Sequence, residues 1–244
     1  AILEYTHGKA QMLGIERDPI LAQYMRQQHI KNLIVHNGNY QDMESIADKN
    51  HLERIDGILF DFGISSWHID SSGRGFSFQR DEVLDMRFSP QEDAPTAAEL
   101  INSLPSEDLA RIFYEYGEER NARRIARAII EERSKKRIVT TGELTDIVAR
   151  VSPKGRRHPS TKIFQALRIA VNNELETVRA GLEAAMRLVT PGGRVVAIAF
   201  HSLEDRIVKN VFRETKKVLT KKVIKPTRAE ITRNPRSRSA LLRA

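Results

Sequence analysis

The stretch that most constrains this chain, residues 55–70, joins a short apolar run to a carboxylate and small polar residues. The apolar run, residues 58–60, has no helical period and is left through Gly63. Such a run between turn residues predicts a strand buried on both faces, and these strands belong to parallel sheets. Asp61 stands where the strand stops, at the sheet edge where open α/β sheets bind ligands. We therefore expect the chemistry at Asp61, although Asp is also a common turn residue that caps loops.

Two further strand and helix pairs precede this stretch. Residues 12–15 form an apolar run that ends on Glu16, and Asp18 before a proline predicts the N-cap of a helix. Residues 33–35 form the next run, with Tyr40 shortly after it. The β-α-β-α-β succession predicts right-handed crossovers and a doubly wound α/β sheet. An acid at the end of an early strand usually accepts hydrogen bonds from a nucleoside's ribose, which makes Glu16 a candidate, and Tyr40 could lie against an adenine ring or simply pack.

Helical signals dominate the middle of the chain. Thr96 and Thr140, each followed three residues later by Glu, predict capping boxes. We expect residues 95–165 to form a helical insertion with a basic surface. The remaining residues, 1–94 and 166–244, are expected to build the sheet domain.

A last buried strand is predicted at residues 194–200, after a turn at residues 191–193. Residues 201–205, His-Ser-Leu-Glu-Asp, leave this strand at the same sheet edge as Asp61. Their spacing matches neither a His-Glu-x-x-His zinc site nor the Gly-x-Ser-x-Gly elbow of a hydrolase. We therefore predict no metal and no nucleophilic serine.

Positive charge is concentrated near the end of the chain. Residues 206–244 carry 13 Lys or Arg and two acids, hence +11, although the whole chain carries only +8. Such a segment indicates a polyanionic partner such as nucleic acid, and a solvated charge run is about equally common. Arg120, Arg123, Arg124 and Arg127 stand at helical spacings that could follow phosphates, although a solvated helix face is the commoner explanation.

Composition limits the class of protein further. The 244 residues are enough for one large α/β domain or for one domain with an insertion. The absence of cysteine excludes disulfides and thiolate metal sites and suits a cytoplasmic protein. No apolar run approaches the roughly 18 residues of a membrane span and nothing at the start is typical of a signal peptide, so we expect no membrane association.

Eight sequence blocks carry a further signal when they are taken in order. They are GIERDP (14–19), DGILFDFGISS (56–66), RGFSF (74–78), LDMR (84–87), YGEE (116–119), FQALR (164–168), HSLEDRIVK (201–209) and NPRSRS (234–239). Together they closely resemble the bacterial MraW (RsmH) family of rRNA methyltransferases. The resemblance covers nearly the whole chain. It implies a class I methyltransferase (Rossmann-like) sheet with a helical insertion, S-adenosylmethionine as cofactor, and the exocyclic amino group of a cytosine in the decoding region of 16S rRNA as substrate.

The same resemblance implies a set of cofactor contacts, on Glu16, Tyr40, Asp61 and His68. Glu16 and Tyr40 stand where Asp and Phe are typical of the family, His68 stands where Gln is typical, and Leu241 replaces a usual Lys in the terminal motif. The family's Gly-Gly-His loop, which holds the methionine end of the cofactor, would lie before the first residue, so we expect either a truncated chain or weak cofactor binding.

The cytosine amine is a poor nucleophile because its lone pair is delocalised into the ring. A carboxylate that accepts one of its N–H groups favours the reactive nitrogen, and we expect Asp61 to be this catalytic group. The target base must be unpaired or flipped, and Trp67, Phe76 and Phe78 are nearby rings that could receive it or pack their own loop. The residues that we expect to contact RNA are Arg74, Arg87, Arg156, Arg157, Arg236 and Arg238.

Two other classes of protein stay open at this point. A nucleotide-dependent dehydrogenase would share the sheet and the acidic strand end but would not need a basic tail. A non-catalytic RNA-binding protein would keep the tail without the methyl transfer. The sequence leaves the oligomeric state open, a dimer included.

Overall fold

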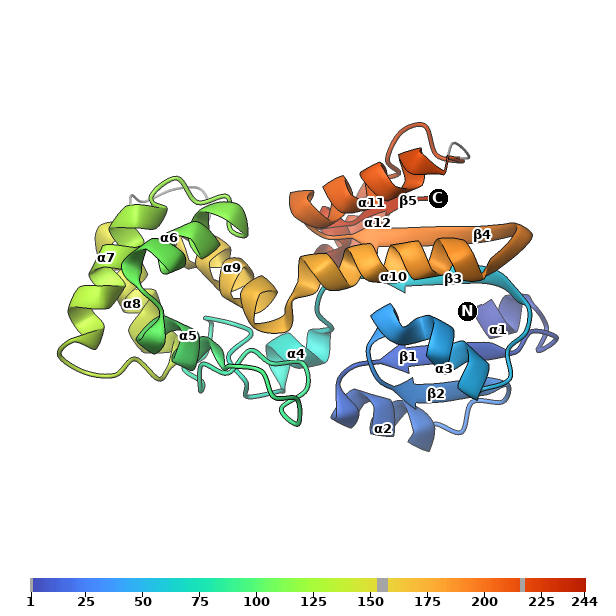
Figure 1. The fold of residues 1–244 in the computed structure, drawn as a ribbon, viewed down its shortest axis with the longest axis horizontal. Helices are drawn as coiled ribbons and strands as arrows, with labels where there is room; N and C mark the ends of the chain where they lie inside the picture. The colour runs from blue at the N-terminus through green and yellow to red at the C-terminus, as the bar shows by residue number, and fades with distance from the viewer. Residues whose placement is uncertain (1, 153–157, 216–217) are drawn as a thin grey trace. The chain divides into compact units, whose positions relative to one another are not determined.

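The computed structural model describes residues 2–152, 158–215 and 218–244, which form two compact units (Figure 1). Unit 1 consists of Ala1–Gly63 and Leu175–Ala244, and unit 2 consists of Ile64–Glu174. The predicted RNA contacts Arg156 and Arg157 lie outside the described residues. No helix in the described part of the chain is long and apolar enough to cross a membrane.

Unit 1 contains five strands among its described residues, with helices between them. Its elements are α1 (Ile2–Tyr5), β1 (Met12–Glu16), α2 (Pro19–Gln27), β2 (Leu33–Asn37), the 3₁₀ helix η1 (Tyr40–Asp42), α3 (Met43–Lys49), β3 (Ile55–Asp61), α10 (Glu174–Leu188), β4 (Val189–Ala199), α11 (Ser202–Glu214), α12 (Arg228–Arg233), the 3₁₀ helix η2 (Pro235–Ser239) and β5 (Leu241–Arg243). Asp18 caps α2, since its side chain accepts hydrogen bonds from two backbone N–H groups of the first turn, and Pro19 is the first helical residue, as predicted.

The strands pair in two groups. β1 and β2 are parallel, with Glu16 beside Asn37, and β3 and β4 are parallel, with Asp61 beside Ile198. β5 adds to the other edge of β4 in the antiparallel direction. Figure 1 shows that β1, β2 and β3 run in the same direction, so their carboxyl ends lie on one side of unit 1. The mixed α/β fold with parallel strands and crossover helices is confirmed.

The prediction that β3 is buried on both faces is wrong. Phe60 is buried, but Leu59 is 50% exposed. Successive side chains of a strand point to opposite faces. Phe60 lies on the face that packs in the core of unit 1, whereas Leu59 lies on the opposite face, which is not covered at that residue.

The predicted turn at residues 191–193 is a bulge inside β4 and does not precede the strand. Ile55 pairs with Val189 and Gly57 pairs with Arg194, so β4 advances five residues while β3 advances two. Gly192 has a φ of +89°, a backbone conformation that glycine adopts without strain. The Pro-Gly-Gly sequence therefore bends the chain as expected but does not interrupt the pairing on either side.

The core of unit 1 lies where α10 and α11 pack against β3 and β4. Leu182 of α10 is fully buried, and Phe212 of α11 and Phe60 of β3 are nearly so. The apolar residues of α11 recur every three or four positions, which gives the helix one buried stripe. This packing fixes the two strand ends that carry Asp61 and the residues after β4.

Unit 2 is helical. Its elements are α4 (Ser66–Asp70), α5 (Ala97–Ser103), α6 (Ser106–Glu115), α7 (Ala122–Arg133), α8 (Thr141–Val151) and α9 (Ser160–Asn172). The capping boxes at Thr96 and Thr140 are both present. Fully buried side chains on α6 to α9 form its core. The unit begins before residue 95 and ends after residue 165, so it is wider than the predicted insertion.

A long irregular segment belongs to unit 2. Residues 71–96, all of them described, contain no helix and no strand of more than one pair. Loops of this length are uncommon in compact domains and usually functional. This one is ordered by burial, because Leu84 and Met86 are fully buried and Phe76 is nearly so.

Candidate active site

Asp61 ends β3 at the carboxyl edge of the strands, as the sequence predicted. The next residue, Phe62, donates its backbone N–H to Ile198 O at 3.0 Å, so the pairing with β4 continues past the carboxylate. Gly63 follows with a φ of +91°, which turns the chain away from the sheet. Asp61 remains accessible to solvent, yet partial burial, and after it the nearby carboxylate of Glu204, raise its pKa. Asp61 is therefore a better proton acceptor than an ordinary Asp.

The corner after β4 is fixed by Glu204. This side chain is only 1% exposed, and its Oε2 accepts hydrogen bonds from the backbone N–H groups of Phe200 (2.8 Å) and His201 (3.3 Å). Its Oε1 lies 3.1 Å from His201 Nε2, and His201 Nδ1 accepts from the backbone of Glu204 at 3.4 Å. These contacts are a capping box at the start of α11. They hold a second carboxylate close enough to Asp61 to change its titration.

Tyr40 lies beside the aromatic residues that flank Asp61. Its ring centroid is 5.6 Å from that of Phe60, in an edge-to-face arrangement, and 5.9 Å from that of Phe62. On its other side Tyr40 packs against α10, where only Gly181 leaves room for the ring. The structure thus brings Tyr40, which follows β2, close to the end of β3, where Asp61 lies.

Glu16 lies at the end of β1, next to the end of β2. Its Oε1 accepts the backbone N–H of Asp18 at 2.8 Å, and its backbone carbonyl accepts hydrogen bonds from the Asn37 side chain and from Gly38 N. These contacts fix the turn that leads from β1 into α2. Glu16, Tyr40 and Asp61 therefore all follow strand ends on one side of unit 1 (Figure 1).

His68, the fourth predicted cofactor contact, belongs to unit 2. It is 4% exposed, and its Nδ1 lies 2.8 Å from Ser65 Oγ and 3.2 Å from Ser65 N, which completes a capping box at the start of α4. Its ring contacts Phe76 and Phe88 edge to face, at 4.9 and 5.3 Å. These contacts describe a side chain held in an aromatic cluster, and its contact with a cofactor stays a prediction.

Arg74 supports the irregular segment from inside. It is 9% exposed, and its Nη1 donates to the carbonyls of Arg87 (2.9 Å) and Phe88 (2.8 Å). Its guanidinium also lies 5.2 Å from the centroid of the Trp67 ring. Arg74 thus joins two parts of the segment, and its contact with RNA stays a prediction.

Arg87 forms a two-pronged ion pair with Asp85, at 2.8 and 2.9 Å. Burial would raise the pKa of Asp85, but hydrogen bonds from the Arg87 side chain and backbone outweigh it and lower the pKa. The same pair raises the pKa of Arg87 above its usual value. The guanidinium is thereby held in one orientation, and its RNA contact is likewise untested.

Asn172 fixes the turn between Asp85 and Phe88, and sequence reasoning missed it. Its Nδ2 donates to Met86 O at 2.7 Å, and its Oδ1 accepts from Phe88 N at 2.8 Å. Met86, fully buried, has a φ of +63°, a region that a non-glycine residue rarely adopts. The amide therefore holds a strained turn in place. Nothing local in the sequence indicates this role, because 84 residues separate Phe88 from Asn172.

Glu204 was also missed as a site residue, although the sequence held a signal for it. A His followed three residues later by Glu, directly after a buried strand, has the spacing of a capping box. Ser65 and His68 repeat this spacing after β3. Both strand ends are thus followed by a helix whose first turn is capped by side chains.

The predicted RNA contacts Arg236 and Arg238 lie on η2 and are exposed. The segment around them is packed in part: Ser237 is buried, and β5 pairs with β4. Arg243 of β5 forms a two-pronged ion pair with Asp205 of α11, at 2.7 and 3.0 Å. The basic tail is therefore anchored at its end, which composition alone did not indicate.

The arrangement suits a positively charged nucleoside ligand. β1 and β3 end on the carboxylates Glu16 and Asp61, and the Tyr40 ring follows β2. Carboxylates at such strand ends bind ribose hydroxyls, and an aromatic ring can pack against a purine. Asp61 forms no ion pair in the described part of the chain, and its raised pKa indicates that no cation neutralises it there. A sulfonium cofactor carries such a charge, so these residues fit S-adenosylmethionine.

Comparison with known proteins gives a consistent result. Residues 1–244 match the MraW methylase family. A protein of Dictyoglomus thermophilum named ribosomal RNA small subunit methyltransferase H is 45% identical over 249 residues, which cover 99% of this chain and 84% of that protein. A protein of Deinococcus deserti with the same name is 47% identical over 239 residues, with 96% of this chain and 79% of that protein covered.

Proposed function

Because the chain belongs to the MraW methylase family, we propose that it transfers a methyl group from S-adenosylmethionine to the rRNA of the small ribosomal subunit. The finer proposal is that the acceptor is the exocyclic amino group of a cytosine in the decoding region of 16S rRNA. The observation that carries it is Asp61, an accessible carboxylate with a raised pKa at the carboxyl edge of the strands. A dehydrogenase and a non-catalytic RNA-binding protein are not supported, because the relatives are named as methyltransferases.

In this proposal three residues of unit 1 hold the cofactor. The Glu16 carboxylate accepts hydrogen bonds from the ribose hydroxyls, and Tyr40 packs its ring against the adenine. Asp61 faces the positive charge. Support comes from the packing of Tyr40 against Phe60 and Phe62, which fixes its ring beside the end of β3. His68 is the fourth proposed contact, and it is positioned by Ser65 and the surrounding rings.

S-adenosylmethionine, when bound, supplies an electrophilic methyl group. Asp61 accepts one N–H of the cytosine amine, which directs the nitrogen lone pair toward the methyl carbon. Asp61 would then take the proton that the amine loses when it is methylated. In the protein without cofactor, the raised pKa makes Asp61 a stronger base than an exposed Asp would be. Glu204 sustains that pKa and also fixes the backbone after β4.

Unit 2 supplies the rings and cations for the base and its flanking nucleotides. Trp67 is partly exposed with the Arg74 guanidinium against its face, a combination on which a base can stack. Phe78 stacks on His158 at 4.8 Å. We propose that the helical insertion recognises rRNA, that Arg236 and Arg238 bind phosphates from unit 1, and that the enzyme acts in the cytoplasm, where ribosomal subunits are assembled.

The test uses small subunits whose rRNA lacks the modification. After incubation with S-adenosylmethionine, mass mapping of rRNA fragments should find one added methyl group on a decoding-region cytosine, at the exocyclic nitrogen. Asp61→Asn is the matched control, since it keeps the side-chain shape and removes the base. Methylation elsewhere in the rRNA would refute the proposal that a decoding-region cytosine is the acceptor. Tight cofactor binding without any methyl transfer would refute the proposed methyltransferase activity.

A further inference from the structure

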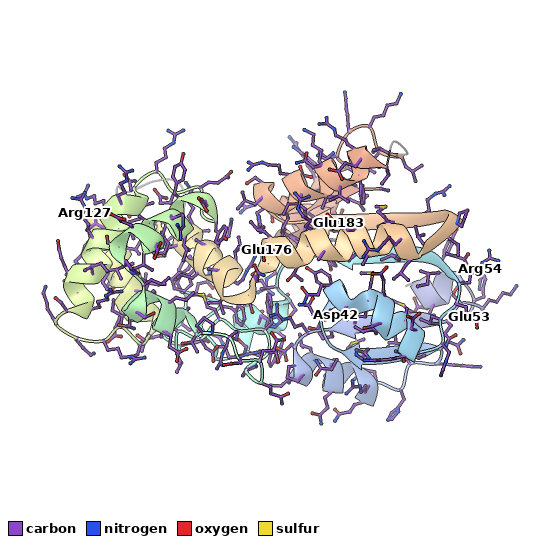
Figure 2. The ribbon with its side chains drawn as sticks, in the orientation of Figure 1. Asp42, Glu53, Arg54, Arg127, Glu176 and Glu183 are labelled. Atoms are coloured by element: carbon purple, nitrogen blue, oxygen red, sulfur yellow. The ribbon has the colours of Figure 1, made fainter. Side chains whose placement is uncertain are left out.

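The helix α7 of unit 2 has two faces of opposite character. One face is apolar, and its buried residues are Ala122, Ile125, Ala126, Ala128 and Ile129. The other face is exposed and carries Arg123, Arg124 and Arg127, with Arg120 in the turn just before the helix. We call these four residues the arginine stripe. Arg127, labelled in Figure 2, lies at the surface of this unit. The apolar face explains why the helix packs, and it gives no reason for four cations opposite.

The arginines of the stripe are not paired with acids in the part of the chain that the structure describes. In the described residues none of its members forms an ion pair. Cations further along the same part of unit 2 do: Lys135 and Arg150 both pair with Glu132, at 3.1 and 3.0 Å, and Lys136 pairs with Glu143 at 2.6 Å. A solvated charged face usually mixes both signs, as this second group does. The stripe therefore differs from ordinary surface charge.

The stripe also opposes the stability of its own helix. Arg123, Arg124 and Arg127 lie in the first two turns of α7, near the positive end of the helix dipole, where cations are unfavourable. No acid lies in the first turn of α7, and the side chain of the N-cap residue Asn121 makes no capping hydrogen bond. By contrast, α5 and α8 each begin with a capping box and a Glu in the first turn. Like charges four residues apart within the helix, as at Arg123 and Arg127, repel each other as well.

A polyanion would relieve each of these costs. Arg guanidinium groups bind phosphate oxygens in a two-pronged geometry, and the positive end of a helix dipole favours anions. The members within the helix, from Arg123 to Arg127, extend about 6 Å along its axis at about 1.5 Å per residue, and Arg120 lies before the first turn. That length suits two or more successive phosphates better than a single small anion.

We propose that the arginine stripe binds the phosphate backbone of the rRNA substrate, away from the base that is methylated. The inference rests on the proposed function, because rRNA is the polyanion that the function supplies. It adds a specific surface on α7 to the expected contacts elsewhere in the chain. Phosphate contacts position the RNA without reading its sequence, so the stripe contributes affinity and orientation.

The test compares two double variants that each remove two positive charges. Arg123→Gln with Arg127→Gln alters the stripe, and Lys135→Gln with Arg150→Gln removes cations that are already paired with Glu132. Gln has nearly the helix propensity of Arg, so α7 should fold in both. Binding to unmethylated small-subunit rRNA is measured between low and high salt. Each lost phosphate contact lowers the slope of log affinity against log salt by about 0.7 to 0.9, so the stripe variant should lose about 1.4 to 1.8.

The control variant should lose less than half of that slope. Equal losses of slope in the two variants would mean that only net charge matters. An unchanged slope in the stripe variant would mean that the stripe does not bind RNA and that its partner is an acidic protein surface. Either result overturns the proposal. Arg123→Lys with Arg127→Lys should keep most of the slope, which separates loss of charge from loss of the helix. Methyl transfer by the unaltered protein is measured in parallel. A slope difference without methyl transfer would refute the proposed function alone, and methyl transfer without a slope difference would refute the stripe alone.

Discussion

Breaking the ion pair between Asp205 and Arg243 should destabilise unit 1 several times more than breaking the pair between Glu44 and Arg187. The two pairs have nearly the same geometry: the N–O distances are 2.7 and 3.0 Å in the first and 2.8 and 2.7 Å in the second. They differ in burial. The side chains are 13% and 20% exposed in the first pair and 59% and 43% exposed in the second.

Burial decides the magnitude because it leaves the remaining partner without water. Arg243→Gln leaves the Asp205 carboxylate partly buried without its cation, which should cost about 2 to 3 kcal/mol of unfolding free energy. Arg187→Gln leaves an exposed Glu44 that water solvates again, so its cost in unfolding free energy should be much smaller. Both pairs lie in unit 1, so one unfolding transition reports on both.

Urea unfolding of the single and double variants of each pair gives two double-mutant cycles. The coupling energy should be about 1 to 3 kcal/mol for Asp205 with Arg243, and it should persist at 1 M salt, where the screening length is about 3 Å. The coupling of the exposed pair should be small at low salt and vanish at high salt. Equal couplings, or one below about 0.5 kcal/mol for the buried pair, would refute the view that this ion pair anchors the C-terminal strand.

Three further predictions concern the site. Asp61→Asn should lower turnover by about 10² to 10⁴-fold. Because the pKa of Asp61 is raised in the folded state, the variant should also be more stable than the natural protein at neutral pH. Urea unfolding at several pH values should show that this gain in stability disappears as the pH falls below the ordinary pKa of Asp. Gly181→Ala would place a Cβ 2.5 Å from Tyr40 Cδ2. The cost of overpacking in unfolding free energy, about 1 to 3 kcal/mol, should exceed the gain in helix propensity of about 1 kcal/mol. Calorimetry should find weaker S-adenosylmethionine binding, and unchanged affinity would argue against Tyr40 as a cofactor contact. Asn172→Ala and Asn102→Ala each remove a side-chain amide that bonds a backbone N–H and a backbone carbonyl of a distant segment. Both should lower the unfolding free energy by about 1 to 3 kcal/mol, but only Asn172→Ala should raise the KM for rRNA. Equal KM values in the two variants would mean that the Asn172 turn is purely structural.

Local patterns in the sequence were enough to predict several helix starts and the position of Asp61. Asp18 before Pro19, and Thr96 and Thr140 before their glutamates, predicted helix starts correctly, because caps involve residues only a few positions apart. The position of Asp61 at the end of its strand also followed from a local pattern. The sequence blocks shared with the family then supplied the reaction, which no local pattern contains.

Features that depend on distant partners could not be predicted in this way. The exposure of Leu59 depends on which distant elements cover the two faces of β3, and the bulge in β4 depends on the register between two strands far apart in the chain. The turn at Met86 is held by Asn172, whose sequence context is an ordinary helix end. Arg74 was predicted only as an RNA contact, and no local pattern indicates that its guanidinium bonds the carbonyls of Arg87 and Phe88.

The discontinuous make-up of unit 1 has a consequence for biosynthesis. Asp61 is translated long before its strand neighbour Ile198, with all of unit 2 between them. At about 5 to 20 residues per second, the ribosome needs roughly 7 to 27 s to make that intervening stretch. During this time β3 has been synthesised but β4 has not, whereas unit 2 is one continuous segment that can fold as soon as it emerges. The nascent chain therefore carries an unpaired apolar strand through much of its synthesis, and early chaperone contact at residues 55–61 would protect it from aggregation.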